Sequence, residues 1–192
     1  MKRYDRAYFD KWYRRVRVHT SGDLQRKVAM AVATCEYFLR RRIRSVLDVG
    51  CGEAAWFPHL RALRPRVTYL GFDPSDYAVE RFGATRNVRQ GSFAELKVDR
   101  QYDLVICSDV MHYLPERDIR RGLPAIVKAT GGMAFLDVLT SEEEIVGDLE
   151  ELIQRPSSWY RKTFSDAGLR QCGPFSWLPA GLASEAARLE LA

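Results

Sequence analysis

Residues 45–52, S-V-L-D-V-G-C-G, constrain the fold of this chain more than any other stretch. Residues 45–49 are mostly valine and leucine, which predicts a short buried strand. Gly50 and Gly52 come next, and residues 53–57 begin like a helix. Glycines in such a turn permit positive φ and close backbone approach, and a helix N-terminus offers unpaired N–H groups. The stretch therefore predicts a strand, a turn and a helix that together bind a nucleotide-like ligand.

A second strand and an acid follow at the spacing that such a unit requires. Residues 67–71, V-T-Y-L-G, predict a strand, and Asp73 stands just after it. An acid about 20 residues past the glycines commonly holds ribose hydroxyls. The alternative is that the glycines only make a tight turn and that Asp73 only caps a helix beginning at Ser75 or Asp76. We favour ligand binding, because strand, glycines, strand and acid occur in the expected order.

Three segments together resemble the class I S-adenosylmethionine-dependent methyltransferases. They are V-L-D-V-G-C-G at 46–52, L-G-F-D-P-S at 70–75 and Y-D-L-V-I-C-S-D-V-M-H-Y-L-P at 102–115. An NAD-binding protein would favour a third glycine where this chain has Ala55, and Asp48 before the glycines is typical of methyltransferases. The resemblance implies a three-layer αβα Rossmann-like methyltransferase fold with a mostly parallel sheet, N-terminal helices, and S-adenosylmethionine as cofactor.

The resemblance also implies roles for individual residues of this sequence. The glycine turn would face the methionine end of the cofactor, and Asp73 would hold the ribose. The family usually has an acid where this chain has Ser92, whose hydroxyl binds the adenine amino group more weakly; Phe93 would pack on the adenine ring. The implied cofactor-binding residues are Asp48, Gly50, Cys51, Gly52, Asp73, Pro74, Ser75, Ser92, Phe93, Ser108 and Asp109.

His112 is the candidate catalytic base, and Tyr113 is a weaker alternative. The ordinary histidine pKa near 6.5 suits proton abstraction at neutral pH, although a histidine here also commonly packs at the junction of strand and helix. We expect no metal: Asp109 and Asp137 offer carboxylates, but Val138 stands where metal-dependent methyltransferases continue with an Asp-Asn pair.

Aromatic side chains near the N-terminus form a candidate lid over the substrate. Tyr8, Trp12 and Tyr13 recur at helical spacing within residues 4–17, and N-terminal helices of the resembling family often lie over the cofactor. An aromatic face attracts a sulfonium by roughly 0.5–2 kcal/mol. The alternative is that these rings only fasten the helix to the domain.

Length and charge set limits on function. The 192 residues suit one domain, and the net charge of +5 comes with arginine clusters in residues 14–17 and 40–44. We interpret these arginines as a solvated face, because no RNA-binding module accompanies them. The four cysteines form no C-x-x-C pair, which favours buried thiols and a cytoplasmic protein. With no apolar run of about 18 residues, we expect no membrane-spanning helix.

The expected organisation is a single domain over 1–192. Residues 1–44 would form the helical lid, 45–178 the Rossmann-like core and 179–192 a C-terminal part with a helix at 182–191. Ser141 and Glu144 predict a capped helix reaching residue 153. Residues 169–175 and 176–178 follow each other almost directly, and Pro179 ends the second segment, which predicts a shortened antiparallel hairpin.

The predicted function is methyl transfer to a small-molecule acceptor, at oxygen, nitrogen or carbon. Position 108–111 reads S-D-V-M instead of the N-P-P-Y-type motif of adenine methyltransferases, so a nucleic-acid partner is disfavoured. Three alternatives stay open: a methyltransferase acting on protein or RNA, a non-catalytic scaffold that kept the cofactor fold, and an NAD-dependent oxidoreductase. A homodimer is also compatible with the sequence.

Overall fold

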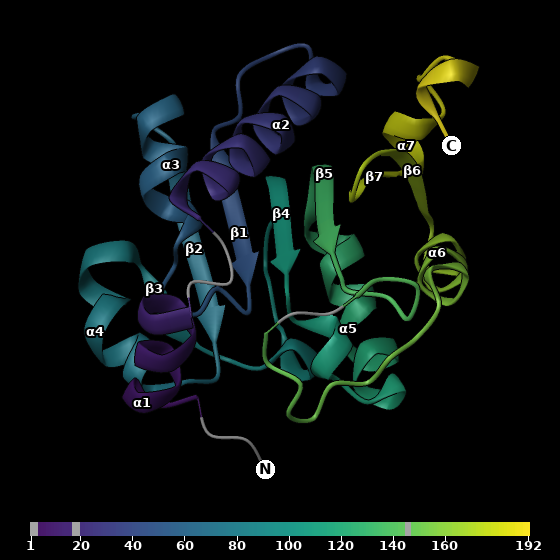
Figure 1. Ribbon diagram of the computed structural model, residues 1–192. Helices are drawn as coiled ribbons and strands as arrows, with labels where there is room; N and C mark the ends of the chain where they lie inside the picture. Colours follow the sequence, from purple (N-terminus) through teal and green to yellow (C-terminus); the bar gives the residue numbers. More distant parts are fainter. Residues whose placement is uncertain (1–3, 17–19, 145–146) are drawn as a thin grey trace.

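A seven-stranded sheet forms the centre of the molecule (Figure 1), in a computed structural model that describes residues 4–16, 20–144 and 147–192. The strands are β1 Ser45–Val49, β2 Thr68–Asp73, β3 Val88–Gln90, β4 Tyr102–Ser108, β5 Thr130–Asp137, β6 Leu169–Gly173 and β7 Ser176–Pro179. Their order is β3-β2-β1-β4-β5-β7-β6, and β7 runs antiparallel to both β5 and β6. The remaining pairs are parallel, which confirms a mostly parallel sheet with a short C-terminal hairpin.

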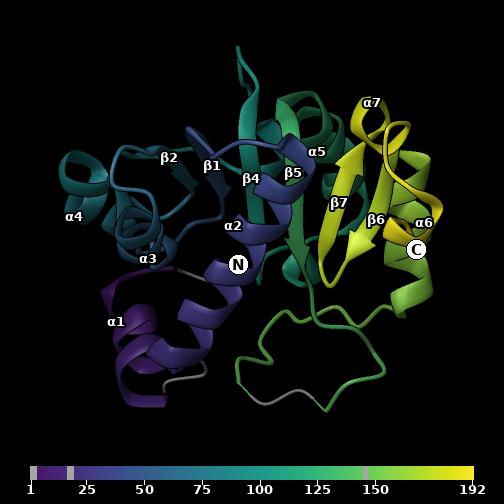
Figure 2. The same cartoon turned by 90° about the horizontal axis from the view of Figure 1, so that it is seen from above.

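Helices cover both faces of the sheet, as Figure 2 shows. They are α1 Arg6–Phe9, α2 Ser21–Leu39, α3 Trp56–Leu63, α4 Asp76–Arg86, α5 Glu116–Ala129, α6 Ser157–Asp166 and α7 Ala180–Ala183. Leu104 and Ile106 of β4 belong to the core with α2 and α3, whereas Val105 and Cys107 belong to the core with α5 and α6. Strand side chains alternate between faces, so β4 is buried on both sides and the three αβα layers are confirmed. Among the described residues, no helix combines the length and apolarity needed to cross a membrane.

The ends of the chain differ from the prediction. The N-terminal helix is only α1, and the backbone continues as a π-helical segment, Asp10–Val16. In place of one helix at 182–191, the short α7 is followed by a separate 3-10 turn, Arg188–Glu190. The Glu190 carboxylate accepts the N–H of Ala187 at 2.7 Å, which starts that turn independently of α7.

The predicted helix at 141–153 is wrong for the described residues, which form turns and irregular backbone. Gly147 has φ +136° and Glu151 has φ +61°, and neither value continues a right-handed helix. Ile145 and Val146, two of the apolar positions behind the prediction, lie outside the described residues.

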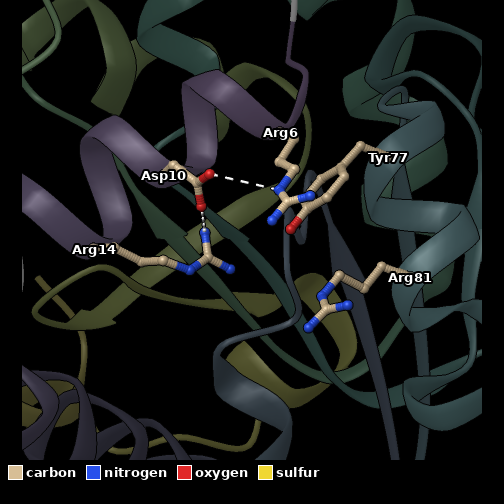
Figure 3. Close-up of a pocket in the computed structure, with 5 residues that line it drawn as sticks. All are labelled: Arg6, Asp10, Arg14, Tyr77 and Arg81. Atoms are coloured by element: carbon tan, nitrogen blue, oxygen red, sulfur yellow. Dashed lines mark ion pairs between the residues drawn. The ribbon is translucent and has the colours of Figure 1, made fainter.

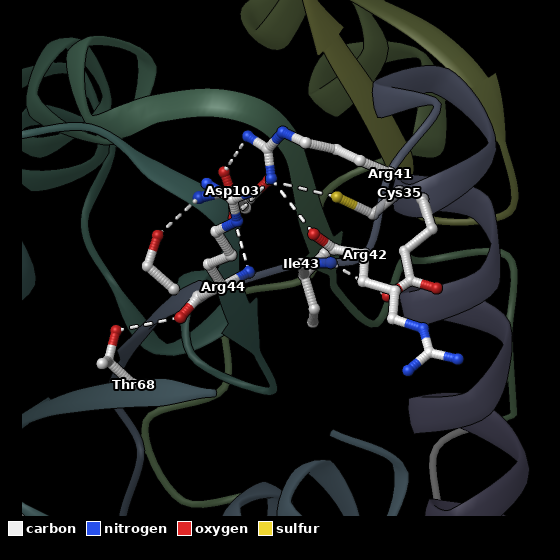
Figure 4. A network of polar contacts seen from close by, with 9 residues as sticks. Cys35, Arg41, Arg42, Ile43, Arg44, Thr68 and Asp103 are labelled. Atoms are coloured by element: carbon white, nitrogen blue, oxygen red, sulfur yellow. Dashed lines mark hydrogen bonds and ion pairs between the residues drawn. The ribbon is translucent and has the colours of Figure 1, made fainter. Parts of the chain in front are cut away.

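Asp103 of β4 ties the N-terminal edge of the sheet to the end of α2 (Figure 4). Its carboxylate accepts the Arg41 guanidinium at 2.7 and 3.0 Å and the N–H of Arg44 at 2.6 Å. Its backbone carbonyl accepts the Cys35 thiol at 3.1 Å. Burial raises the pKa of Asp103, but the bonds from Arg41 and Arg44 outweigh burial and hold that pKa below its ordinary value.

We expect Asp103→Ala to lower the free energy of unfolding by about 2 kcal/mol at neutral pH, because a hydrogen bond to a charged group contributes about 1.5–3 kcal/mol. A depressed folded-state pKa gives stability that is present above the unfolded pKa of about 3.9 and is lost as the pH falls through the folded value. The difference in the free energy of unfolding between the wild type and Asp103→Ala should therefore become smaller at acidic pH. Urea unfolding at neutral pH and below about pH 3 measures both effects. The exposed Asp99→Ala is the control, and equal stability of the two variants at neutral pH would contradict this role.

Candidate active site

A cavity of about 600 Å³ opens at the carboxyl ends of β1 and β4. Asp48 and Gly50 border it from β1 and the turn that follows, and Ser108 and Asp109 border it from the end of β4. Open α/β sheets bind ligands at this edge, where the strand order reverses, and small-ligand sites measure roughly 300–1,000 Å³. The structure thus brings one part of the predicted cofactor site together around a cavity of suitable size.

The glycine turn is fixed against both neighbouring strands. Gly50 has φ +74° and Gly52 has φ +51°, which glycine adopts without strain. The N–H groups of Gly50 and Cys51 donate to the carbonyl of Phe72 in β2, at 2.7 and 3.1 Å. A Cβ on Gly50 would lie 2.3 Å from Cγ2 of Val110, just past β4. The turn therefore needs glycine at position 50, because the backbone there has positive φ and because Val110 leaves no room for a Cβ.

Asp73 lies buried at the end of β2, beside the glycine turn. One carboxylate oxygen accepts the N–H of Gly52 at 2.7 Å, and the other accepts the N–H of Ser75 at 2.9 Å. Burial raises the pKa of Asp73, and these two backbone bonds oppose the rise. Ser75, not Asp73, is the N-cap of α4, because its hydroxyl accepts the N–H of Ala78 at 3.2 Å.

The N-terminal segment covers the site next to Asp73. Phe9 is buried and its ring stacks on that of Tyr77, with centroids 5.5 Å apart. The open side of Gly52 faces the same segment, since a Cβ there would lie 3.1 Å from atoms of both Phe9 and Tyr13. Asp73 does not line the 600 Å³ cavity. Asp73, the residue predicted to hold the ribose, thus lies under this segment and apart from the residues that border the cavity.

Ion pairs link residues of the N-terminal segment to one another (Figure 3), and one further pair links the segment to the core. Arg14 pairs with Asp10 at 2.8 Å and with Glu53, which follows the glycine turn, at 2.7 Å. Arg6 lies 3.7 Å from Asp10, and Arg81 of α4 borders the same small pocket. Exposed pairs of this kind contribute about 0–1 kcal/mol each, so the buried Phe9 ring holds the segment more strongly than they do.

The predicted lid residues Tyr8, Trp12 and Tyr13 all border the cavity, and Trp56 of α3 borders it from the core. Burial, and next the carboxylate of Asp148, raise the pKa of the Tyr8 phenol well above its ordinary value. The Tyr8 ring is therefore a neutral wall of the cavity. The movement of this segment as a lid stays a prediction.

His112 and Tyr113 tie described residues of the segment after β5 to the end of β4. Nδ1 of the buried His112 accepts the N–H of Leu139 at 3.1 Å, and the His112 carbonyl accepts the N–H of Ile153 at 2.8 Å. The Tyr113 hydroxyl donates to the carbonyl of Asp148 at 2.9 Å. With the Nδ1 lone pair engaged, a neutral His112 ring carries its proton on Nε2 and acts as a donor there. A base role for His112 would require the bond to Leu139 to break.

Sequence reasoning missed Lys27 of α2, which borders the cavity. Its Nζ lies 2.5 Å from a carboxylate oxygen of Asp137, which also accepts the Ser108 hydroxyl at 2.9 Å. Burial and the neighbouring Asp109 raise the pKa of Asp137, and Lys27 opposes that rise. The sequence held a signal for a buried role of Lys27. Lys27 stands three residues after Leu24 and four before Ala31, so it lies on the apolar face of α2.

The residues predicted around adenine do not border the cavity. Phe93 is buried against α5, and a Cβ on Gly122 would lie 2.5 Å from its ring. The Ser92 hydroxyl donates to Glu95 at 3.3 Å, and Pro74 is exposed. The adenine contacts therefore stay a prediction.

Residues 47–131 match a family model described as a methyltransferase domain. This span contains the glycine turn, Asp73 and the end of β4, which are the segments that build the site. The match agrees with the Rossmann-like order of the strands in the sheet. The matched segment and the fold support a class I methyltransferase that uses S-adenosylmethionine, as the motifs predicted.

Solved structures of low sequence identity share the fold. S-adenosylmethionine-bound CalS10, an amino pentose methyltransferase from Micromonospora echinaspora, has a TM-score of 0.66 and 17% identity over 89% of this chain and 92% of that one. DesVI from Streptomyces venezuelae has a TM-score of 0.64 and 12% identity over 83% and 92% of the two chains. The sugar N-methyltransferase KedS8 from a Streptoalloteichus species has a TM-score of 0.61 and 18% identity, over 82% of this chain and 88% of that one. No curated protein matches the sequence.

Proposed function

We propose that this enzyme transfers a methyl group to a small molecule held in the 600 Å³ cavity. The supporting observation is the wall of that cavity, which combines Tyr8 and Trp12 of the N-terminal segment with Lys27 of α2 and with Leu139 and Asp148 of the segment after β5. Walls from three separate parts of the chain suit a small ligand better than an extended polymer. CalS10 and KedS8, which share the fold, are described as acting on sugars.

The residues present fit the cofactor. Gly50 borders the cavity, and Asp73 adjoins the same turn with a carboxylate able to accept ribose hydroxyls. When bound, S-adenosylmethionine supplies an electrophilic methyl group. The protein then has to hold the acceptor collinear with that methyl, and such positioning lowers a barrier by roughly 7–11 kcal/mol. We propose that His112, which borders the cavity, helps to position the acceptor there.

Asp73→Ala should weaken binding of S-adenosylhomocysteine roughly 10–150-fold, because hydrogen bonds to a charged group contribute about 1.5–3 kcal/mol. Calorimetry of the wild type and the variant measures this, with NAD as a ligand expected not to bind. Asp73 also bonds Gly52 and Ser75, so a thermal melt of each protein accompanies the titration. Equal affinity of the two folded proteins for S-adenosylhomocysteine would contradict the ribose role of Asp73.

The size of the acceptor is tested separately. The enzyme is incubated with methyl-labelled S-adenosylmethionine and with low-molecular-weight, protein or RNA fractions of a cell extract. We expect the label in the low-molecular-weight fraction. Label transferred only to protein or RNA would contradict a small-molecule acceptor.

A further inference from the structure

A second, smaller pocket lies between the N-terminal segment and α4 (Figure 3). It measures about 170 Å³, and it is bordered by Arg6, Asp10 and Arg14 of the segment and by Tyr77 and Arg81 of α4. None of these five residues borders the 600 Å³ cavity. The pocket is therefore a separate site, and the methyl transfer proposed above makes no use of it.

The side chains around this pocket carry more positive than negative charge. Three of its described lining residues are arginines, which stay protonated in proteins, and one is an aspartate. The carboxylate of Glu53, which is not part of the lining, pairs with Arg14 at 2.7 Å. With Glu53 counted, three guanidinium groups still stand beside only two carboxylates. The pocket therefore favours an anionic ligand.

The donors for such a ligand come from Arg6 and Arg81, since Arg14 is engaged by its two carboxylate partners. Arg6 lies 3.7 Å from the Asp10 carboxylate, which is too long for a hydrogen bond. Arg81 forms no hydrogen bond or ion pair within the part of the chain that the structure describes. The carbon at the centre of its guanidinium lies 5.7 Å from the centroid of the Phe82 ring. Both arginines thus keep N–H groups that a ligand can accept from.

The two elements that carry these arginines are packed on each other. Phe9 of the segment is buried and stacks on Tyr77, which stands one helical turn before Arg81 in α4. The Tyr77 hydroxyl also donates to Glu53 at 3.3 Å. A ligand that accepts from Arg6 and Arg81 bridges the segment and α4. Binding does not have to bring the two elements together, which lowers its entropic cost.

We propose that this pocket binds a phosphate group, as inorganic phosphate or as the phosphate of a small ester, with Arg6 and Arg81 as its binding residues. A volume of about 170 Å³ accommodates the phosphorus and its four oxygens at about 30 Å³ per atom, the volume of a water molecule in the liquid. Phosphate oxygens point in several directions, so they can accept from guanidinium groups on two elements at once. A carboxylate has two oxygens in one plane, and Asp10 already supplies such a group to the arginines of the segment.

The test is a titration of the protein followed by NMR, at constant ionic strength so that screening of surface charges stays the same. The probes are inorganic phosphate and the matched pair glucose 6-phosphate and glucose. We expect at least one phosphate probe to bind saturably with a Kd of about 1 mM or tighter, and glucose not to bind. Arg81→Gln and Arg6→Gln should each weaken that binding at least about 10-fold, as the loss of one charged hydrogen bond predicts. The tighter of the two phosphate probes identifies the free ion or the ester as the source of the group, and either order supports the site.

Arg121→Gln is the matched control. Arg121 is an exposed arginine of α5 outside the pocket, and like Arg81 it forms no ion pair with the described residues. Its substitution should leave phosphate binding unchanged. Arg81→Lys keeps the charge but not the planar guanidinium, so it should bind phosphate more weakly than the wild type and more tightly than Arg81→Gln. A thermal melt of each variant shows that it is folded.

The proposal is overturned if neither phosphate probe binds saturably, or if glucose binds as tightly as glucose 6-phosphate. It is also overturned if Arg81→Gln and Arg6→Gln bind phosphate as tightly as Arg121→Gln does. Binding of an RNA oligonucleotide through these arginines, with no binding of either small probe, would replace the small ligand by a nucleic acid. These outcomes do not depend on methyl transfer, because the titration contains no cofactor and none of the substituted residues borders the cavity.

Discussion

Gly50→Ala is expected to reduce methyl transfer at least about 100-fold, the loss that a misplacement of about 1 Å in an active site produces. The added Cβ would lie 2.3 Å from Cγ2 of Val110, far inside van der Waals contact. Either the turn or the residues after β4 must move, and both border the cofactor side of the cavity. The φ of +74° adds strain of roughly 1–2 kcal/mol for any residue with a Cβ.

Two further variants separate these effects. Gly50→Ala combined with Val110→Ala removes the steric conflict and keeps the strained φ, so it should recover part of the binding of S-adenosylhomocysteine. Gly181→Ala in α7 is the control, because nothing lies within 4 Å of a Cβ built there. Calorimetry with S-adenosylhomocysteine and turnover with an identified acceptor report binding and chemistry. Wild-type affinity and turnover in Gly50→Ala would show that the turn tolerates a side chain and would contradict this account of the site.

The sheet and the cofactor turn could be predicted because their signals are local. A valine-rich strand, two glycines and an acid after the next strand occupy fewer than 30 residues, and each has one physical explanation. The strand order then follows from the family that these motifs resemble. The short hairpin was predictable for a similar reason, since the two strand-like segments follow each other almost directly and Pro179 ends the second one.

The walls of the cavity could not be predicted, because they depend on contacts between distant residues. The pair of Lys27 and Asp137 spans 110 positions, and only the packing of α2 on β5 brings it together. Residues 141–153 have helical spacing in the sequence, yet the bond from Ile153 to His112 replaces helical bonds with tertiary ones. Local propensity is a weak predictor wherever such tertiary bonds compete.

Asp48 is the second residue from which we expect a large effect. Its buried carboxylate accepts the Tyr69 hydroxyl at 2.7 Å. Burial raises the pKa of Asp48 to about 7; the bond from Tyr69 opposes this rise, and the charge of Asp73 adds to it. In an unfolded chain the pKa of an aspartate is about 3.9. Between these two pH values the folded protein therefore holds a proton that the unfolded chain releases.

Asp48→Asn should stabilise the protein increasingly as the pH rises from about 4 to about 7. A folded-state pKa raised above the unfolded value gives stability that is complete below the unfolded pKa and is lost as the pH rises through the folded one. Across about three pKa units the wild type should lose about 4 kcal/mol relative to the variant, whose amide oxygen still accepts the Tyr69 hydroxyl. Urea unfolding at about pH 4, 6 and 8 measures the difference, with the exposed Asp99→Asn as control. A difference between the wild type and Asp48→Asn that stays constant over this range would show that Asp48 is already ionised in the folded protein, stabilised by charges or hydrogen bonds that outweigh its burial.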